Sequence, residues 1–444
     1  MSLPAPKFFR ALLVIATAWG VLATLPATAR DAAPAPAASA PYALFGGKPL
    51  QWERSGGKVV GVYTPNWQPT ALVDALHGDS VTHVVYAFLH VCGPGQLPED
   101  APKCAGKSDY QIATSAIDDS FNDAFARLKA RAPHVKVVAS VGGWGGSDPF
   151  FHLANDPARR AVFAASVTQF LQTHPAFDGI DIDWEHPTSN GSANGVALGT
   201  PADGQGYADL MVDLRRALDA LSAQTGRRYL LTAAVNTTES LATKVNHADA
   251  AKVMDLVFMM TYDFAGGWTP LAGHHTPLAS PTPDSNDSLE GAVRVMTKAG
   301  VPAHKLVAGV AMYGRGFAGV KGPGPNGFNG VPRTGVFPGK EGDITYRELA
   351  GGWLGLKGTG TQGWRTVYDR ITQSYTLWNA REQQMIGYDD PRSVRRKGRF
   401  AVAHGLAGVF AWELSQDNGD ILNAMNLGVG QTPGPAQAKP LKRP

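Results

Sequence analysis

The 444-residue sequence is poor in cysteine and in charge. Charged residues make up 17% of it and the net charge is +3, which gives no reason to expect nucleic acid or another strongly charged partner. No cluster of cysteine and histidine accompanies Cys92 and Cys104, which argues against a metal site there. The 44% of hydrophobic residues is enough for a sizeable core.

Long hydrophobic runs are also missing after the first 25 residues. We interpret residues 1–29 as a secretory signal peptide, because Lys7 and Arg10 precede the apolar run 11–25 and Ala27–Ala29 offers small residues for cleavage. An uncleaved membrane anchor is the alternative, but the run is short for a spanning helix. We therefore expect a protein exported to the periplasm or the cell exterior, with no membrane segment after cleavage.

Alanine and proline mark the ends of the mature chain. We expect a linker and N-terminal segment over residues 30–57, a catalytic domain over 58–427 and a disordered tail over 428–444. Both cysteines lie in one loop rich in proline and glycine, and an exported protein favours a disulfide between them. Two buried free thiols are the alternative.

Short apolar segments alternate with helical ones along the domain, which predicts a parallel sheet closed into a (β/α)8 barrel. An open doubly wound sheet is the rival, but no phosphate-binding first turn is present, and the G-x-G-x-x-G at 322–327 carries two prolines. Residues 316–400 exceed one crossover helix and predict a small α+β insertion between strands seven and eight. The expected barrel strands are 58–63, 81–89, 135–141, 178–185, 229–235, 256–262, 305–313 and 406–413.

The fourth of these segments carries an unusual run of acids. Asp181, Asp183 and Glu185 alternate with two isoleucines and Trp184, so a strand would place the three acids on one face, about 7 Å apart. Such a stack of like charges is unfavourable unless protons are shared or the field is used. A divalent-metal site is the alternative, but no other strand end clearly supplies hard oxygen ligands.

Acids and aromatic residues recur where five of the predicted strands end, and these ends meet at one face of a barrel. Aromatic platforms beside carboxylates suit a sugar, and glycoside hydrolysis needs a protonated acid at the leaving oxygen. We choose Glu185 for this acid and expect repulsion from Asp183 and Asp181 to raise its pKa. The five strand ends are Ser140–Gly143, Asp183–Glu185, Met260–Phe264, Tyr313–Arg315 and Trp412–Glu413.

Two of these motifs carry a family resemblance. Asp178–Glu185 resembles the D-x-x-D-x-D-x-E signature of family 18 glycoside hydrolases, and Ser140–Gly143 resembles that family's S-x-G-G. From about Val59 to Leu427 the chain is similar to bacterial chitinases of the chitinase A type. Further shared segments are Gly143–Trp144, Ser147–Phe150, Met260, Tyr262–Asp263, Ala311–Arg315, Tyr388–Asp390 and Arg392–Ser393.

The resemblance implies retaining hydrolysis of chitin or chitooligosaccharides in which the substrate's acetamido oxygen is the nucleophile, without metal or cofactor. Glu185 would be the general acid and base, and Asp183 would orient the acetamido group while sharing a proton with Asp181. Tyr262 would bind the acetamido carbonyl, while Asp178 and Ser140 would support strand ends.

The resemblance also implies a deep groove, with the insertion as one wall. Trp412 would form its floor, and Met260, Asp263, Tyr313 and Arg315 would line the same subsite. Trp144 and Trp268 would extend the product side, and Tyr63 and Trp67 the substrate side. His186 departs from the family, which usually has tyrosine or phenylalanine there; it would alter the pH dependence or be a structural replacement.

Two other functions remain open at this stage. A non-catalytic sugar-binding protein on the same barrel typically lacks the terminal glutamate, which is present here as Glu185. A hydrolase of other N-acetylglucosamine polymers is the second, although the long insertion and the tryptophans favour chitin. No separate chitin-binding module is evident, which puts action on crystalline chitin in doubt. We expect a monomer.

Overall fold

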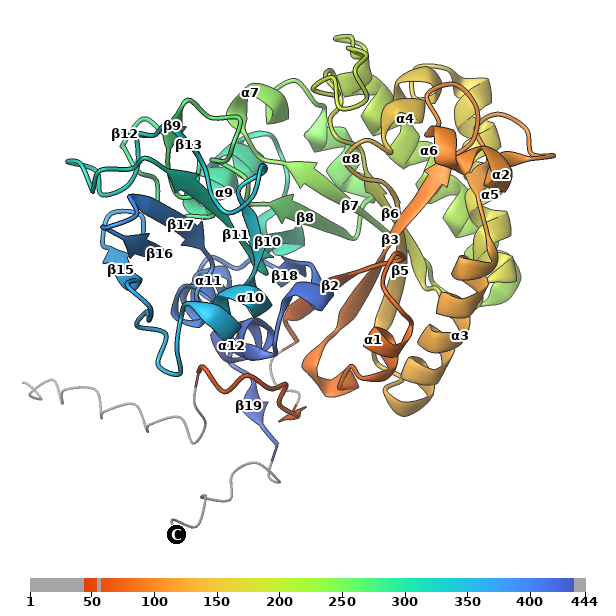
Figure 1. The fold of residues 1–444 in the computed structure, drawn as a ribbon. Coiled ribbons are helices and arrows are strands. Elements are labelled where there is room, and N and C mark those ends of the chain that lie inside the picture. Colours follow the sequence, from red (N-terminus) through yellow and green to blue (C-terminus); the bar gives the residue numbers. More distant parts are fainter. Residues whose placement is uncertain (1–43, 54–56, 435–444) are drawn as a thin grey trace, which may run out of the picture. The chain divides into compact units, whose positions relative to one another are not determined.

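The computed structural model describes residues 44–53 and 57–434 (Figure 1). The predicted signal peptide lies outside the described residues, as do most of the predicted linker and the end of the predicted tail. No helix among the described residues is both long and apolar enough to cross a membrane.

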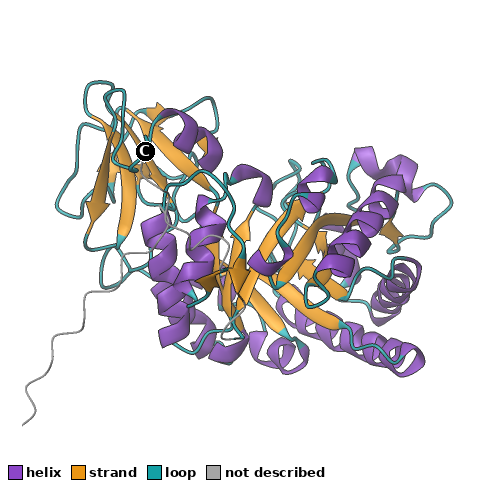
Figure 2. Cartoon of the chain, turned by 90° about the horizontal axis from the view of Figure 1, so that it is seen from below, coloured by secondary structure: helices purple, strands orange, loops and turns teal. Residues whose placement is uncertain are grey.

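Within these residues, eight parallel strands form a closed barrel in the order β2, β18, β10, β8, β7, β6, β5, β3, and the pairing of β2 with β3 completes the ring. Figure 2 shows the strands at the centre with helices around them. The predicted (β/α)8 barrel is confirmed. The strands are β2 (Val59–Pro65), β3 (His83–Val91), β5 (Lys136–Gly142), β6 (Gly179–Asp183), β7 (Leu230–Asn236), β8 (Leu256–Met260), β10 (Leu306–Ala311) and β18 (Gly408–Trp412).

Alternation along each strand separates two layers of core. Ile180 and Ile182 of β6 belong to the large cluster between strands and helices, so Asp181 between them points into the barrel. The barrel interior is a small cluster of apolar residues from seven of the strands. Its buried members are Val59, Tyr63, Val85, Ala87, Val138, Ala234, Phe258, Val307 and Phe410.

The helices outside the barrel begin and end at residues that are typical helix caps. Asp156 accepts from the first backbone amides of α5 with Pro157 in the first turn, and Asp390 caps α11 in the same way. Gly226 closes α6 at a positive φ of 68°. The helices are α1 (Ala71–Asp74), α2 (Ala101–Cys104), α3 (Ala116–Arg131), α4 (Asp148–Leu153), α5 (Pro157–Thr173), α6 (Asp203–Thr225), α7 (Glu239–Ala242), α8 (His247–Val253), α9 (Leu289–Lys298), α10 (Tyr346–Gly352), α11 (Pro391–Ala403) and α12 (Asp420–Gly428).

The predicted α+β insertion between the seventh and eighth barrel strands is present. An antiparallel sheet in the order β13, β11, β17, β16, β15, with β14 on β11, is accompanied by helix α10. Its bounds differ from the predicted 316–400, because β11 begins at Tyr313 and α11 packs on β10 and β18 as a barrel helix. The sheet comprises β11 (Tyr313–Ala318), β13 (Gly335–Val336), β14 (Asp343–Thr345), β15 (Arg365–Asp369), β16 (Ser374–Asn379) and β17 (Gln384–Tyr388).

Three short pairings complete the fold. Strand β4 (Ile112–Ala113) lies antiparallel to β3, and β9 (Leu271–Ala272) pairs with β12 (Val331–Pro332). Strand β1 (Trp52–Glu53) pairs with β19 (Thr432–Pro433). Residues 428–434 are therefore part of the fold, where the sequence alone predicts a disordered tail from residue 428.

Cys92 and Cys104 form the predicted disulfide, with their Cα atoms 5.5 Å apart. The bridge ties the end of β3 to helix α2. Gly95 in the bridged loop lies so close to Asp148 and Pro149 that a Cβ there would come within 2.9 Å of their backbone atoms. The disulfide loop thus supports the start of α4, which follows the end of β5 at the barrel mouth.

Candidate active site

Asp181 lies fully buried in the barrel interior and accepts hydrogen bonds from three strands. Tyr63 Oη and Ser140 Oγ donate to its Oδ2 at 2.9 Å and 2.8 Å, and Thr232 Oγ1 donates to its Oδ1 at 2.6 Å. Burial raises the pKa of Asp181, and the three hydroxyl donors oppose that rise. Tyr63 was predicted to line the substrate side of the groove, but it is only 1% exposed and its hydroxyl donates to Asp181.

Asp183 is the next acid on the same face and is also buried, at 3% exposure. Its Oδ1 has no hydrogen-bond partner among the described residues. Burial raises the pKa of Asp183 well above its ordinary value, and the charges of Glu185 and Asp181 add to the rise. Asp183 therefore tends to hold a proton and keeps one oxygen unpaired.

Glu185 lies two residues beyond β6, because the predicted strand 178–185 ends at Asp183. Gly143 N donates to the Asp183 carbonyl at 2.8 Å, and the Glu185 amide then leaves the sheet and donates to Ser147 Oγ at 3.0 Å. The Ser147 hydroxyl lies 2.9 Å from the same Asp183 carbonyl, so it spans the last residue of the strand and the acid beyond it.

The environment of Glu185 raises its pKa to about 8. Burial is the main cause, since its side chain is only 16% exposed, and the negative charge of Asp263 adds to it. Glu185 and Asp183 also repel each other, and this repulsion, together with the charge of Asp181, adds to the raised pKa of Asp183. Glu185 is consequently a carboxylic acid near neutral pH.

Asp263 follows β8 and stays ionised although it is largely enclosed. Burial favours its neutral form, but hydrogen bonds from His275 and Arg315, together with the Arg315 charge, outweigh burial and hold the pKa of Asp263 below its usual range. Arg315 Nε and Nη2 reach its two oxygens at 2.9 Å and 3.0 Å. The mouth thus holds an acid with a raised pKa and one with a lowered pKa.

Tyr262 and Tyr313 meet edge to face, with ring centroids 6.1 Å apart. Burial, followed by the charges of Asp183, Glu185 and Asp263, raises the pKa of Tyr262 well above its ordinary value, so its hydroxyl keeps its proton and can donate. Met260, at the end of β8, packs on the barrel-interior cluster.

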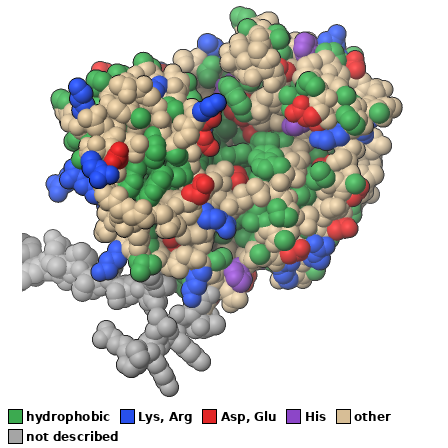
Figure 3. All heavy atoms as spheres, in the orientation of Figure 1, with side chains coloured by type: hydrophobic (Ala, Val, Ile, Leu, Met, Phe, Trp, Pro, Cys, Tyr) green, Lys and Arg blue, Asp and Glu red, His purple; other side chains and the backbone are tan. Residues whose placement is uncertain are grey.

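Trp412 ends β18 and lies in an aromatic group at the mouth. Its ring stacks on Phe88 at 5.6 Å with 22° between the planes, and Tyr63 and Trp67 lie 5.4 Å and 6.3 Å away. Figure 3 shows hydrophobic side chains gathered on this face, with acidic side chains among them. A flat ring held by other rings is a suitable floor for the apolar face of a sugar.

The three other predicted tryptophans are exposed. Trp67, Trp144 and Trp268 have 60%, 61% and 59% exposure. Trp67 lies beside Trp412, Trp144 lies 6.2 Å from the ring of His186, and the Arg315 guanidinium lies 5.1 Å from the Trp268 ring. The structure thus brings all three to the neighbourhood of the acids.

Gly142 and Gly143 allow this crowding at the end of β5. Both have positive φ, 111° and 83°. A Cβ on Gly142 would lie 2.2 Å from the Asp183 carbonyl oxygen, and one on Gly143 would lie 2.6 Å from the ring of Phe88. Any side chain here would push β6 or the ring under Trp412 away.

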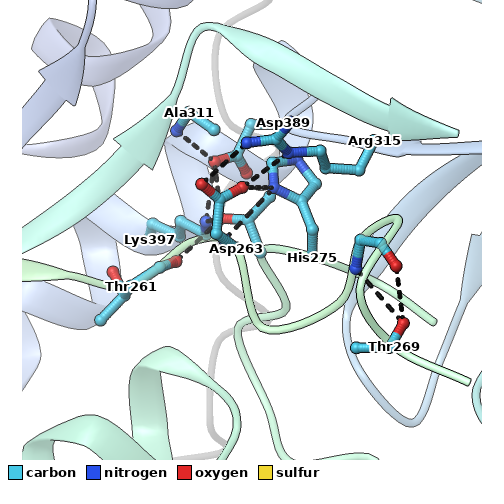
Figure 4. Close-up of polar contacts among 10 residues, drawn as sticks. Thr261, Asp263, Thr269, His275, Ala311, Arg315, Asp389 and Lys397 are labelled. Atoms are coloured by element: carbon cyan, nitrogen blue, oxygen red, sulfur yellow. Dashed lines mark hydrogen bonds and ion pairs between the residues drawn. The ribbon is translucent and has the colours of Figure 1, made fainter. Parts of the chain in front are cut away.

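A buried ion pair holds the Tyr262–Asp263 segment from behind (Figure 4). Lys397 Nζ, on α11, donates to Asp389 Oδ2 at 2.7 Å, and the Ala311 amide reaches the same oxygen at 3.0 Å. Thr276 Oγ1 lies 3.1 Å from that oxygen and 3.0 Å from the Thr261 carbonyl, directly before Tyr262. Asp178 is at the other end of the barrel, paired with Lys129 and Arg227.

Sequence reasoning missed three residues of the site, Phe88, Thr232 and His275, and it named Ser147 in a shared segment without assigning it a role. Thr232 carried a signal, because it is the one polar residue in the apolar segment 229–235 and faces the barrel interior. Nothing in the sequence marks His275 as a partner of Asp263, since they meet through a loop. No group of three or more His, Cys, Asp or Glu in the described part of the chain is arranged to hold a metal ion.

Comparison with known proteins identifies the family. The sequence model described as "Glycosyl hydrolases family 18" matches residues 59–417. The chain belongs to this family. It is therefore a glycoside hydrolase by descent, and the resemblance inferred from the D-x-x-D-x-D-x-E motif is confirmed.

Among the relatives of this family 18 member is a "Chitinase A" from Pseudoalteromonas piscicida, which is 35% identical over 86% of this chain and 53% of its own length. A "Probable endochitinase" from Orgyia pseudotsugata multicapsid polyhedrosis virus is 33% identical over 84% of this chain and 72% of the relative. The chain thus spans about half of the first and under three quarters of the second.

Solved structures give the same fold. Chitinase ChiA74 from Bacillus thuringiensis matches with a TM-score of 0.71 at 26% identity, over 84% of this chain and 70% of that one. A family 18 N-acetylglucosaminidase from Paenibacillus barengoltzii matches with a TM-score of 0.69 at 28% identity, over 84% and 99%.

Proposed function

We propose that this protein is a secreted chitinase that hydrolyses β-1,4 linkages between N-acetylglucosamine units with retention at the anomeric carbon. The carrying observation is the pair of acids at the mouth: Glu185, with a pKa raised to about 8, and Asp263, held ionised by Arg315. Of these two acids, Glu185 is the one that holds the proton that a leaving glycosidic oxygen needs.

The first step transfers the Glu185 proton to that oxygen while the glycosidic bond breaks. The nucleophile would come from the substrate, as the family resemblance implies. This agrees with both oxygens of Asp263 being bound by Arg315, with Asp181 being buried under three hydroxyls, and with Asp183 tending to hold a proton. The acetamido carbonyl oxygen bonds to the anomeric carbon and forms an oxazolinium ion.

Asp183 and Tyr262 would position the acetamido group for this attack. Asp183 offers an unpaired oxygen to the acetamido N–H, and Tyr262 keeps a proton to donate to the carbonyl. As positive charge forms, Asp183 would be its counter-ion, with its proton taken up towards Asp181. Glu185, now a carboxylate, takes a proton from water as the water oxygen opens the oxazolinium ring.

Chitin fits the exposed aromatics better than a single sugar does. Trp67, Trp144 and Trp268 would stack successive rings along the mouth, as would Trp412 below them. A sugar-binding protein without activity is disfavoured by Glu185 itself. The Paenibacillus neighbour makes release of single N-acetylglucosamine units the second candidate.

Secretion is part of the proposal and rests on two observations. Residues 1–29 have the pattern of a signal peptide, and the Cys92–Cys104 disulfide suits an oxidising compartment. The mature protein should begin at Arg30, be monomeric by light scattering, and show no free thiol after unfolding without reductant. A free thiol in the mature protein would contradict the oxidised state.

The test compares products from chitin oligomers for the wild type, Glu185→Gln and the control Asp249→Asn, an exposed acid paired with Lys252. We expect Glu185→Gln to lose at least about 100-fold in rate, because amide cannot supply the proton, while the control stays active. Equal activity in Glu185→Gln would refute the acid. If the only products are single sugars released one at a time, the protein is an N-acetylglucosaminidase. If it cleaves peptidoglycan but not chitin, its substrate is a different polymer of N-acetylglucosamine.

A further inference from the structure

A small cavity lies beside Glu185, between the end of β6 and helices α6 and α8. It leaves about 20 Å³ for the centre of a water-sized molecule, which is enough for one water. Its lining is apolar except for a few groups, among them Trp184, His186, Asn236 and His247. None of the steps above uses it.

Three side chains of this lining have unpaired ring nitrogens. The Nε1 of Trp184, the Nδ1 of His186 and both ring nitrogens of His247 are buried and have no hydrogen-bond partner among the described residues. Burying a polar group without a hydrogen-bond partner is unfavourable. Four such nitrogens from three residues around one cavity indicate a common partner.

Asn236 is the first of two groups that favour a proton on Nδ1 of His186, and the second is the partner proposed below. The Thr238 amide donates to Asn236 Oδ1 at 2.8 Å, which fixes the orientation of that side-chain amide. Its Nδ2 then faces His186 Nε2 at 3.4 Å and is a donor there. His186 Nε2 is therefore an acceptor, and the proton is on Nδ1, the nitrogen without a protein partner.

Three of these four nitrogens, one from each residue, match the valence of one water molecule. Trp184 Nε1–H and His186 Nδ1–H are two donors, and a neutral His247 supplies an acceptor. Burial lowers the pKa of His186 and of His247 to about 4 each, so both rings are neutral at neutral pH. A water that accepts twice and donates once has the three bonds that are usual for a buried water.

We propose that this cavity holds one ordered water that joins His186 to His247 and helps to keep His186 in the Nδ1–H tautomer, in which the nitrogen nearer Glu185, Nε2, carries no proton. Nε2 lies 3.8 Å from Glu185 Oε2. Without a proton on Nε2, His186 offers no N–H donor to Glu185, which disfavours the carboxylate relative to the protonated acid. His186 is thus a positioning residue for the general acid.

Few other groups face His186. The Trp144 ring lies 6.2 Å away, Asn236 contacts Nε2, and Tyr207 and His247 line the cavity. Of these groups and Glu185, only Glu185 titrates near neutral pH, because burial raises the pKa of Tyr207 and lowers that of His247. The effect of His186 on the general acid rests on the proposed function, whereas the tautomer and the water do not depend on that function.

The direct test is the ¹⁵N spectrum of histidine-labelled protein at neutral pH. Two-bond couplings separate the two tautomers, His186→Phe identifies the signals of His186, and the exposed His404→Asn is the control that should leave them in place. We expect a single neutral Nδ1–H tautomer for His186. An Nε2–H tautomer, a mixture or an imidazolium would overturn the proposal.

The second test removes the acceptor. In His247→Phe we expect the tautomers of His186 to mix and the basic limb of kcat/KM to move down by about half a pH unit, with KM little changed. Unchanged tautomer and profile would refute the link. If His247→Phe does not fold, the wild-type spectrum still decides. A bromide ion at the cavity in soaked crystals would show an anion site instead. If the protein shows the Nδ1–H tautomer but does not cleave chitin, the proposed function is refuted while the inference about the tautomer and the water stands.

Discussion

Arg315 binds both carboxylate oxygens of Asp263, Nε to Oδ1 at 2.9 Å and Nη2 to Oδ2 at 3.0 Å. This fork keeps Asp263 charged at the mouth of a barrel where Asp183 and Glu185 tend to be neutral. The separation of pKa values among neighbouring acids assigns their roles: one supplies a proton and the other supplies the field that keeps it in place.

The pH dependence follows from that separation. Glu185 must be protonated to act as the acid, so kcat/KM should fall as the pH rises through about 8. Asp263→Asn removes a negative charge that raises this pKa and leaves Arg315 unpaired, so the basic limb should move to lower pH. Rate profiles of both proteins check this. Asp249→Asn is the control. If the basic limb of Asp263→Asn coincides with that of the wild type, Asp263 does not act on Glu185.

The free energy of unfolding should depend on pH, because burial of Glu185 disfavours its carboxylate form. Folding raises the pKa of Glu185, so its unfavourable contribution is absent below the unfolded-state pKa near 4 and grows until the pH reaches about 8. Glu185→Gln should therefore raise the free energy of unfolding at pH 8, by on the order of 5 kcal/mol, and change it little at pH 4. Urea unfolding at both values measures this. A variant less stable than the wild type at pH 8 would contradict the burial argument.

Lys397 and Asp389 form an enclosed ion pair, with 0% and 1% side-chain exposure. Lys397→Met leaves the carboxylate buried without its counter-ion and should cost about 3 kcal/mol of unfolding free energy. Because Thr276 connects this pair to the Thr261 carbonyl, the variant should also lower kcat. Exposed Lys298→Met is the matched control. Equal unfolding midpoints for the two variants would contradict this role of the pair.

The exposed tryptophans should affect long substrates more than short ones. Trp67→Ala, Trp144→Ala and Trp268→Ala each remove a proposed stacking platform, worth about 1 kcal/mol in binding, so KM should rise several-fold for long oligomers. Stability should change little, since each side chain is about 60% exposed. Leu356→Ala, at 92% exposure on the insertion, is the control. Equal effects on dimer-length and long substrates would argue against a row of subsites.

Local pattern was sufficient for the barrel. Its strands are short apolar segments, and the period-2 alternation of Ile180 and Ile182 with the acids places Asp181 and Asp183 in the interior without knowledge of the partners. The insertion was visible as excess length, but its edge strand Arg365–Asp369 has a weak pattern because it is only partly buried.

The electrostatics of the site were less predictable. The repulsion between Asp183 and Glu185 was expected from their spacing, but the charge of Asp263, which follows another strand and also acts on Glu185, was not. That relation arises when the barrel closes. Ser147 and His275 likewise reach Glu185 and Asp263 from loops whose path no periodicity encodes.

The source of the nucleophile is the central claim, and the anomeric configuration of the first product tests it most directly. Proton NMR of a chitin oligomer with fresh enzyme should show the β-anomer of the new reducing end first, followed by slow mutarotation, because the acetamido oxygen and then water attack opposite faces. An α-anomer as the first product would mean direct attack by water and would contradict the account.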